Sequence, residues 1–198
     1  MFNDFFEVLK ENHFVEKPVD AKTFVESPDY LGQPPLSDIQ YTIVEAMSQI
    51  YRKEDLIEIL GDVEGSRHFA KYTKNELILQ LGKGSGKDFI STVACAYVVY
   101  KLLCLKDPAI YYGKPAGDAI DIINVAVNAQ QAKNVFFKGF KTKIEKSPWF
   151  AGKYNAKADS IEFDKAITVY SGHSERESHE GLNLLMAVLD EISGFVSE

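Results

Sequence analysis

Short apolar runs alternate with longer stretches of helical spacing in the second half of the chain. Leu77–Leu81 is apolar on both faces, which is typical of a central strand in a parallel sheet. Gly86 to about Leu105 is apolar nearly all round and predicts a buried helix. Further buried strands are expected at Ile120–Val127 and Leu184–Leu189. This alternation predicts an α/β fold with a mainly parallel sheet flanked by helices, joined by right-handed crossovers.

Local patterns predict two amphipathic helices and a hairpin. One helix begins at Ser37, which can form a capping box with Gln40. A charged stretch at residues 52–75 contains a short amphipathic piece around Leu56. Residues 161–163 and 167–169 alternate around a polar turn and predict an antiparallel hairpin. The expected buried stripes of the two helices are Ile39, Ile43, Met47 and Ile50, and, after an N-cap at Asn128, Ala132, Phe136, Phe140 and Ile144.

Composition is that of an ordinary globular domain. The pattern divides the 198 residues into a loosely structured lead-in, residues 1–35, and one domain, residues 36–198. No apolar run reaches the roughly 18 residues that a membrane-spanning helix requires. Cys95 and Cys104 fall in the predicted buried helix and are interpreted as reduced core thiols.

Charge is unevenly distributed along the chain. The net charge of −7 argues against nucleic-acid binding over the whole surface. Residues 128–158, however, contain seven lysines and one acid, Glu145. This stretch either faces phosphates or forms a solvated helix face.

A glycine-rich turn lies between the first predicted strand and the buried helix. Backbone N–H groups of such a turn wrap a phosphate, and the helix N-terminus adds its positive dipole end. Lys87 would reach the β- and γ-phosphates of a nucleotide. Two features depart from the usual pattern: Leu81 stands where the first glycine is expected, and Asp88 replaces the Ser or Thr that binds magnesium. The residues expected to bind nucleotide here are Gly82, Lys83, Gly84, Ser85, Gly86, Lys87 and Asp88.

Two carboxylates follow the last predicted strand. Asp190 and Glu191 would lie at the carboxyl edge of the sheet, where ligands bind in folds of this kind. Asp190 is expected to bind Mg²⁺ directly or through water, and Glu191 to orient the attacking water. Alone the pair is an ordinary polar strand end; together with the loop it predicts a hydrolytic nucleotide site.

Four segments between about residues 30 and 198 resemble, in order and spacing, the large terminase subunit of tailed bacteriophages, the ATPase that packages DNA. The second and the last are shared by many ATPases with a phosphate loop, whereas the set of four is more specific. The segments are Pro35–Gln40, Gly82–Asp88, Ile161–Gly181, and Ala187–Glu191 followed by Ile192 and Phe195.

This resemblance implies a P-loop NTPase fold with an additional acidic strand. It implies a motor that uses ATP and Mg²⁺ to move double-stranded DNA into the procapsid. The implied partners are the portal protein, the small terminase subunit and further copies in a ring, in the host cytoplasm and without a membrane. In ATPases of this type the strand after Asp-Glu inserts between the phosphate-loop strand and the Asp-Glu strand. The sheet of residues 1–198 is therefore expected to be incomplete, as part of a longer protein.

The resemblance also implies roles for three further residues. Gln40 would hydrogen-bond the adenine, although the capping box competes for the same side chain. Lys83 stands where the family often has an arginine that acts on the γ-phosphate; otherwise it is a plain exposed loop lysine. Arg176 is the candidate finger for a neighbouring subunit's nucleotide, with a surface ion pair as the alternative.

Asp88 separates the functional hypotheses. As a metal ligand, direct or through water, it would make nucleotide binding depend on Mg²⁺. Otherwise it marks a degenerate site, and the domain is a nucleotide-binding or assembly module without turnover. A third hypothesis is another P-loop ATPase, such as a helicase-like enzyme.

Overall fold

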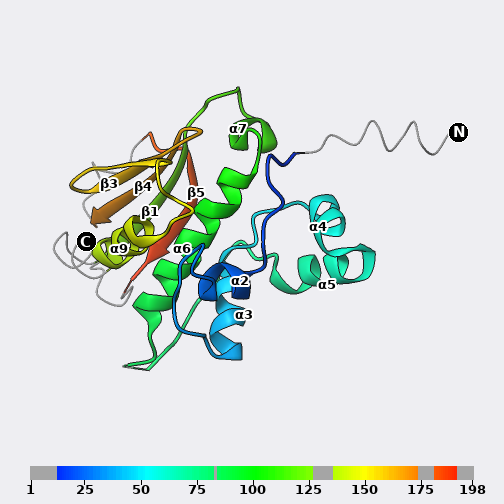
Figure 1. The fold of residues 1–198 in the computed structure, drawn as a ribbon, viewed down its shortest axis with the longest axis horizontal. Coiled ribbons are helices and arrows are strands. Elements are labelled where there is room, and N and C mark those ends of the chain that lie inside the picture. Colours follow the sequence, from blue (N-terminus) through cyan, green and yellow to red (C-terminus); the bar gives the residue numbers. More distant parts are fainter. Residues whose placement is uncertain (1–12, 83, 127–135, 174–180, 191–198) are drawn as a thin grey trace, which may run out of the picture.

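Helix α6 lies between a five-stranded sheet and the N-terminal helices (Figure 1). The computed structural model describes residues 13–82, 84–126, 136–173 and 181–190. The helices are α2 (Ala21–Glu26), α3 (Asp38–Met47), α4 (Lys53–Leu60), α5 (Asp62–Tyr72), α6 (Lys87–Cys104), α7 (Pro108–Tyr111) and α9 (Lys138–Lys146).

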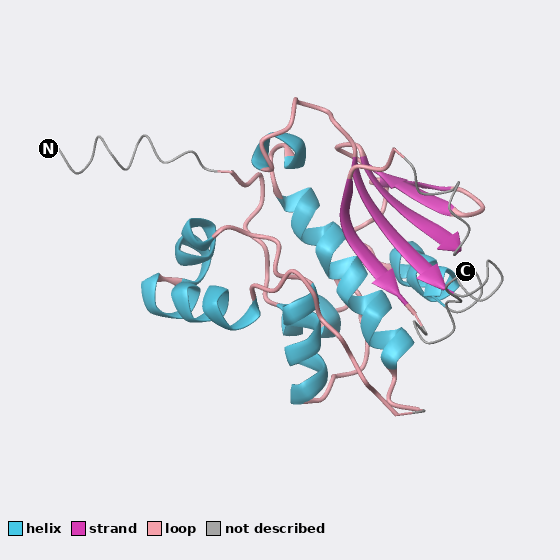
Figure 2. Cartoon of the chain, turned by 180° about the vertical axis from the view of Figure 1, so that it is seen from behind, coloured by secondary structure: helices cyan, strands magenta, loops and turns pink. Residues whose placement is uncertain are grey.

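The sheet is mixed, with strand order β2-β3-β4-β1-β5 (Figure 2). Strand β1 runs parallel to both of its neighbours, β4 and β5, whereas β2, β3 and β4 pair antiparallel. The predicted α/β class and the predicted hairpin, now β3 and β4, are confirmed, whereas the predicted mainly parallel sheet is mixed in the described residues, because β2, β3 and β4 form an antiparallel meander. The strands are β1 (Ile120–Ala126), β2 (Tyr154–Ala156), β3 (Ser160–Phe163), β4 (Ile167–His173) and β5 (Leu184–Leu189).

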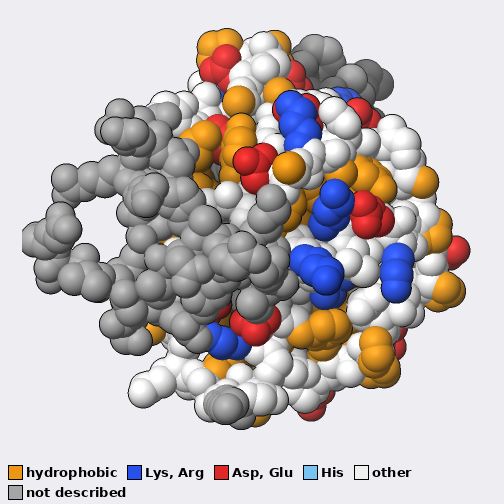
Figure 3. Space-filling model, turned by 90° about the vertical axis from the view of Figure 1, so that its left-hand side faces the viewer, with side chains coloured by type: hydrophobic (Ala, Val, Ile, Leu, Met, Phe, Trp, Pro, Cys, Tyr) orange, Lys and Arg blue, Asp and Glu red, His pale blue; other side chains and the backbone are white. Residues whose placement is uncertain are grey.

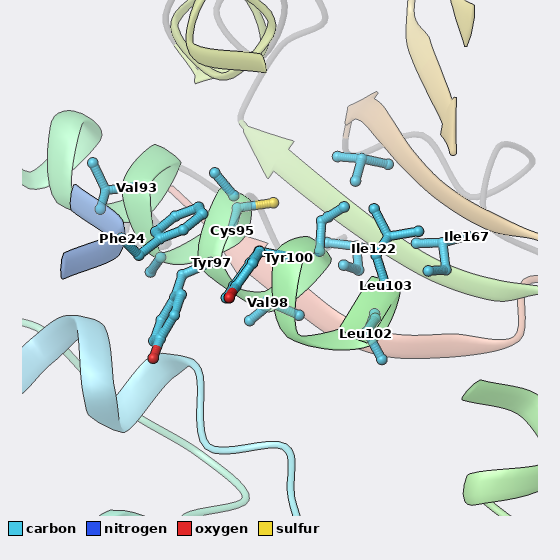
Figure 4. Packing of buried hydrophobic residues seen from close by; sticks show 14 of the residues in the cluster. Phe24, Val93, Cys95, Tyr97, Val98, Tyr100, Leu102, Leu103, Ile122 and Ile167 are labelled. Atoms are coloured by element: carbon cyan, nitrogen blue, oxygen red, sulfur yellow. The ribbon is translucent and has the colours of Figure 1, made fainter. Parts of the chain in front are cut away.

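Helix α6 forms the centre of the hydrophobic core, as its all-round apolar sequence predicts. Phe24 of α2 stacks on Tyr100 with ring centroids 4.8 Å apart, and Ile122 of β1 belongs to the same core (Figure 4). Cys95 and Cys104 are free and buried, as expected. Within the part of the chain that the structure describes, no helix, α6 included, is long and apolar enough to cross a membrane.

The N-terminal lead-in is more ordered than its sequence suggests. Asp20 caps α2 by accepting a hydrogen bond from the Thr23 backbone N–H at 2.9 Å. Phe24 and Val25 are both completely buried. The expectation of a loose lead-in is therefore wrong from residue 13 onward, because aromatic packing against α6 holds this segment in place.

Helix α3 begins as predicted, and the predicted stripe of Ile43, Met47 and Ile50 packs against the core, with Ile39 as the exception. Ser37 caps it, and both hydrogen bonds of the capping box with Gln40 are present. Ile39, however, is 73% exposed, and Val44 is the fully buried residue of the helix. The predicted stripe is wrong at Ile39 because this first turn projects beyond the core that the later turns contact.

The largest difference from the sequence prediction concerns Leu77–Leu81. This segment forms no strand, and Ile78 is 75% exposed. Strand β5 has the predicted bounds, but it is half-exposed, with Leu184 at 50% and Leu189 at 51%. Among the described residues, β5 pairs only with β1 and ends the sheet. An apolar run can form a buried strand only if neighbours cover it. Within the described ranges, Leu77–Leu81 pairs with no strand and β5 pairs on one side only.

Candidate functional site

The glycine loop connects residues 77–81 to the N-terminus of α6. Gly84 and Gly86 both have φ of +80°, a left-handed conformation that strains residues with a side chain. The loop closes on itself before Gly86, since the Ser85 N–H donates to the Gly82 carbonyl at 3.2 Å. Gly86 then serves as the N-cap of α6 without a side chain that could bind the first N–H groups. Those groups are the ones that bind anions at a helix start.

Lys87 and Asp190 meet beside this loop although 103 positions separate them in sequence. The Lys87 Nζ donates to Asp190 Oδ1 at 2.7 Å. Asp190 follows the last residue of β5, and its backbone N–H donates to the Val125 carbonyl of β1 at 2.9 Å. This hydrogen bond continues the pairing of the two strands and fixes the position of Asp190. The structure thus brings together two predicted site residues, as a direct ion pair that sequence reasoning did not foresee.

Gln40 also reaches the loop. Its Nε2 donates to the Ser85 carbonyl at 3.5 Å, while its Oε1 accepts from the Ser37 backbone N–H at 2.9 Å. A Cβ added at Gly86 would lie 3.5 Å from the same Nε2. The side chain therefore caps α3 and lies against the phosphate loop at the same time, so the capping box that the sequence predicts is present.

The donor set fits a magnesium–phosphate ligand. Asp88 lies half-buried in the first turn of α6, where the helix dipole favours a carboxylate. Mg²⁺ is commonly held by one or two carboxylates together with phosphate oxygens, and Asp88 and Asp190 can supply the former. The Ser85 Oγ is buried and finds no hydrogen-bond partner among the residues that the structure describes. Residues 13–82, 84–126, 136–173 and 181–190 hold no group of three or more His, Cys, Asp or Glu that could bind a metal ion by itself.

Three predicted site residues lie outside the described residues: Lys83, Arg176 and Glu191. Asn128 and Ala132 of the predicted helix lie outside them as well. The remaining apolar positions of that helix, Phe136, Phe140 and Ile144, are buried as expected.

The basic stretch divides into exposed and buried lysines. Basic side chains are spread over the face that carries α9 and β3 (Figure 3). Lys138 and Lys146 are exposed there, but Lys143 is only 9% exposed. Sequence reasoning missed this difference, although Lys143 lies three positions after Phe140 and one before Ile144, on the buried side of the helix.

Comparison with known proteins places the chain in a family. Residues 2–198 match the family model described as the N-terminal P-loop domain of the uncharacterized protein MJ0330. The chain belongs to this P-loop domain family. It is also 40% identical over 127 residues to the uncharacterized protein MJ0330 of Methanocaldococcus jannaschii. That match covers 59% of this chain and 22% of the relative, so the chain spans about a fifth of the relative's length. No solved structure matches the chain.

Proposed function

We propose that this domain binds ATP with Mg²⁺ at the loop formed by residues 82–88 and hydrolyses it. The observation that carries the proposal is the contact between Lys87 and Asp190 at the N-terminus of α6. A cation from the loop and a metal-binding carboxylate from a strand end are the two groups that phosphoryl transfer requires close together. Membership in a P-loop domain family supports the nucleotide.

The candidate residues of the loop, the strand end and α3 have separate roles in this proposal. The N–H groups at the start of α6 and the Lys87 ammonium bind the phosphates, while Asp88 and Asp190 bind the metal ion. Bound Mg²⁺ would neutralise charge that develops on the phosphate oxygens. Glu191, directly after Asp190 in sequence, orients the attacking water. Gln40, already against the loop, is the candidate contact for the adenine.

A magnesium nucleotide that binds here would have to separate the Lys87–Asp190 ion pair. Lys87 is 39% and Asp190 18% exposed, so a ligand can reach both groups. An ion pair with this exposure is worth only about 0–1 kcal/mol. A magnesium nucleotide can therefore separate the pair at small cost, giving Lys87 a phosphate and Asp190 a metal ion.

Phosphate release tests the enzymatic part of the proposal. The wild-type chain should release phosphate from ATP only with Mg²⁺, and Glu191→Gln should lose release by at least about 100-fold while retaining nucleotide binding. Release that is unchanged in Glu191→Gln, or that persists in EDTA, contradicts the assigned roles.

The second candidate is a nucleotide-binding module without turnover. Asp88 favours it, because a carboxylate in place of the usual hydroxyl adds negative charge beside the phosphates. Two variants discriminate between the two candidates. Asp88→Ser, which restores the usual hydroxyl, gains phosphate release if Asp88 inactivates the site. Asp88→Ala, which removes every ligand atom of the side chain, loses Mg²⁺-dependent binding if Asp88 is a metal ligand.

The finer proposal, a terminase motor that moves double-stranded DNA, rests on the sequence resemblance. The described lysines on the α9 face are its candidate DNA contacts. Binding to duplex DNA should weaken steeply with salt concentration, and a salt-independent binding constant contradicts this contact. ATP hydrolysis stimulated by duplex DNA would favour a motor over a nucleotide-binding module without turnover.

A further inference from the structure

Two lysines among the described residues, Lys101 and Lys143, are buried. The ammonium group of Lys101 has partners that explain its burial. Lys101 of α6 is 3% exposed, and its Nζ donates to the Ser48 carbonyl at 2.7 Å. The same ammonium lies 4.7 Å from the ring centroid of Tyr51 and 5.2 Å from that of Tyr97. Burial lowers the pKa of Lys101 to about 8, and the nearby Glu45 carboxylate partly opposes this shift. Lys101 is thus a structural residue with polar, aromatic and ionic partners.

Lys143 of α9 has much less support. It is 9% exposed, and its Nζ lies 4.5 Å from the ring centroid of Phe89. Over the described ranges, its ammonium makes neither a hydrogen bond nor an ion pair. Burial lowers the pKa of Lys143 to about 8, and no carboxylate opposes the shift. A buried cation whose contact is one aromatic ring is costly unless an anion compensates it.

The position of Lys143 indicates which anion would compensate it. Phe89 lies in the first turn of α6, two positions after Lys87. One turn earlier on α9, Gly139 packs so closely on α6 that an added Cβ would lie 3.6 Å from Thr92 Cγ2. Helix α9 therefore packs on the N-terminal half of α6, and the Lys143 ammonium lies against a side chain of the first turn of α6, the turn that follows the phosphate loop.

We infer that Lys143 is a second phosphate-binding lysine, which contributes from α9 to the anion site at the N-terminus of α6. The ligand class is the polyphosphate of a nucleotide, and the inference rests on the proposed function. Lys87 approaches this ligand from within α6, and Lys143 approaches it from the neighbouring helix. A phosphate group gives the buried ammonium the negative partner that the described side chains do not provide.

Substitution of Lys143 by Met tests the inference, because Met keeps the apolar stem and removes the charge. Lys141→Met is the matched control: Lys141 lies on the same helix and pairs with Glu145 at 3.8 Å. Calorimetric titration with Mg·ATP and with magnesium pyrophosphate should show about ten-fold weaker binding to Lys143→Met and a smaller dependence on salt. Lys141→Met should bind as the wild type does, and Lys143→Arg should restore most of the affinity.

The outcomes separate this inference from the proposed function. If Lys87→Met loses binding and a folded Lys143→Met binds as tightly as the wild type, Lys143 is merely structural and the inference is wrong. If the wild-type chain binds neither ligand, both the inference and the proposed function are wrong. Weaker ATP binding with unchanged pyrophosphate binding would also overturn a phosphate contact. Thermal unfolding shows that each variant is folded; Lys143→Met should unfold at or above the wild-type temperature, since it removes an uncompensated charge.

Discussion

Strand β1 and the segment Leu77–Leu81 are both apolar runs, yet β1 is a buried strand whereas Leu77–Leu81 is exposed and forms no strand. Every residue of β1 is buried between β4 and β5, and Ile122 is completely inaccessible. The segment before the glycine loop pairs with no described strand, and Ile78 is 75% exposed. The difference shows that the apolar pattern specifies what a segment can become, whereas burial depends on whether neighbours are present to cover it.

The largest expected contrast lies between Phe24 and Ile78. Phe24→Ala should lower the free energy of unfolding by about 3–5 kcal/mol, because it removes a buried ring that stacks on Tyr100. Ile78→Ala should change it by less than about 0.5 kcal/mol. Urea denaturation measures both, and equal losses would show that residues 77–81 are covered in solution.

The two parallel neighbours in the sheet give the next contrast. Ile122→Ala in β1 should cost about 2–5 kcal/mol, since Ile122 has no exposed surface. Leu189→Ala in β5, at 51% exposure, should cost less than about 1 kcal/mol. The same denaturation experiment ranks them, and a larger loss for Leu189→Ala would mean that β5 is not an edge strand.

The buried ammonium group of Lys101 predicts that the free energy of unfolding depends on pH. The pKa of Lys101 falls from 10.5 to about 8 on folding, so the folded state releases this proton first as pH rises. Between pH 8 and 10 the unfolded state binds more protons, and the contribution of Lys101 to stability therefore increases with pH, by at most about 1.4 kcal/mol per unit. The stability difference between wild type and Lys101→Met should shift in favour of the wild type over this range. Lys141→Met should show no such shift, and a flat difference for Lys101→Met contradicts the buried ammonium.

The half-exposed strand β5 predicts self-association of the chain, which a substitution on β5 should reduce with little change in the free energy of unfolding. Leu184→Lys on β5 should alter the free energy of unfolding by less than about 0.5 kcal/mol, because Leu184 is half-exposed. A charge on an unpaired edge strand should reduce concentration-dependent self-association, measured by light scattering. Association that is unaffected by Leu184→Lys, but abolished by a charge at Ile78, would locate the contact at residues 77–81 instead.

The sequence predicted the bounds of most helices and strands better than it predicted which side chains are buried. Gly86–Leu105 predicted α6 closely, because a helix that is apolar all round must be buried, and the bounds of β5 were correct. The predicted strand at Leu77–Leu81 and the predicted burial of Ile39 were wrong, since both depend on tertiary neighbours.

In the candidate site, the glycine spacing identified the loop and the strand end identified Asp190. The Lys87–Asp190 pair and the depth of Lys143 depend on how helices and strands cross, which no local pattern contains.

Binding of Mg·ATP to the wild-type chain and to Lys87→Met tests the central claim most directly. Isothermal titration calorimetry should show saturable binding to the wild type, lost in EDTA. Affinity should fall roughly 100-fold in Lys87→Met, which corresponds to about 2.7 kcal/mol. Lys141→Met serves as the control and should bind normally. Equal affinity of the wild type and Lys87→Met, or no binding to a folded wild-type chain, would contradict a nucleotide site at residues 82–88.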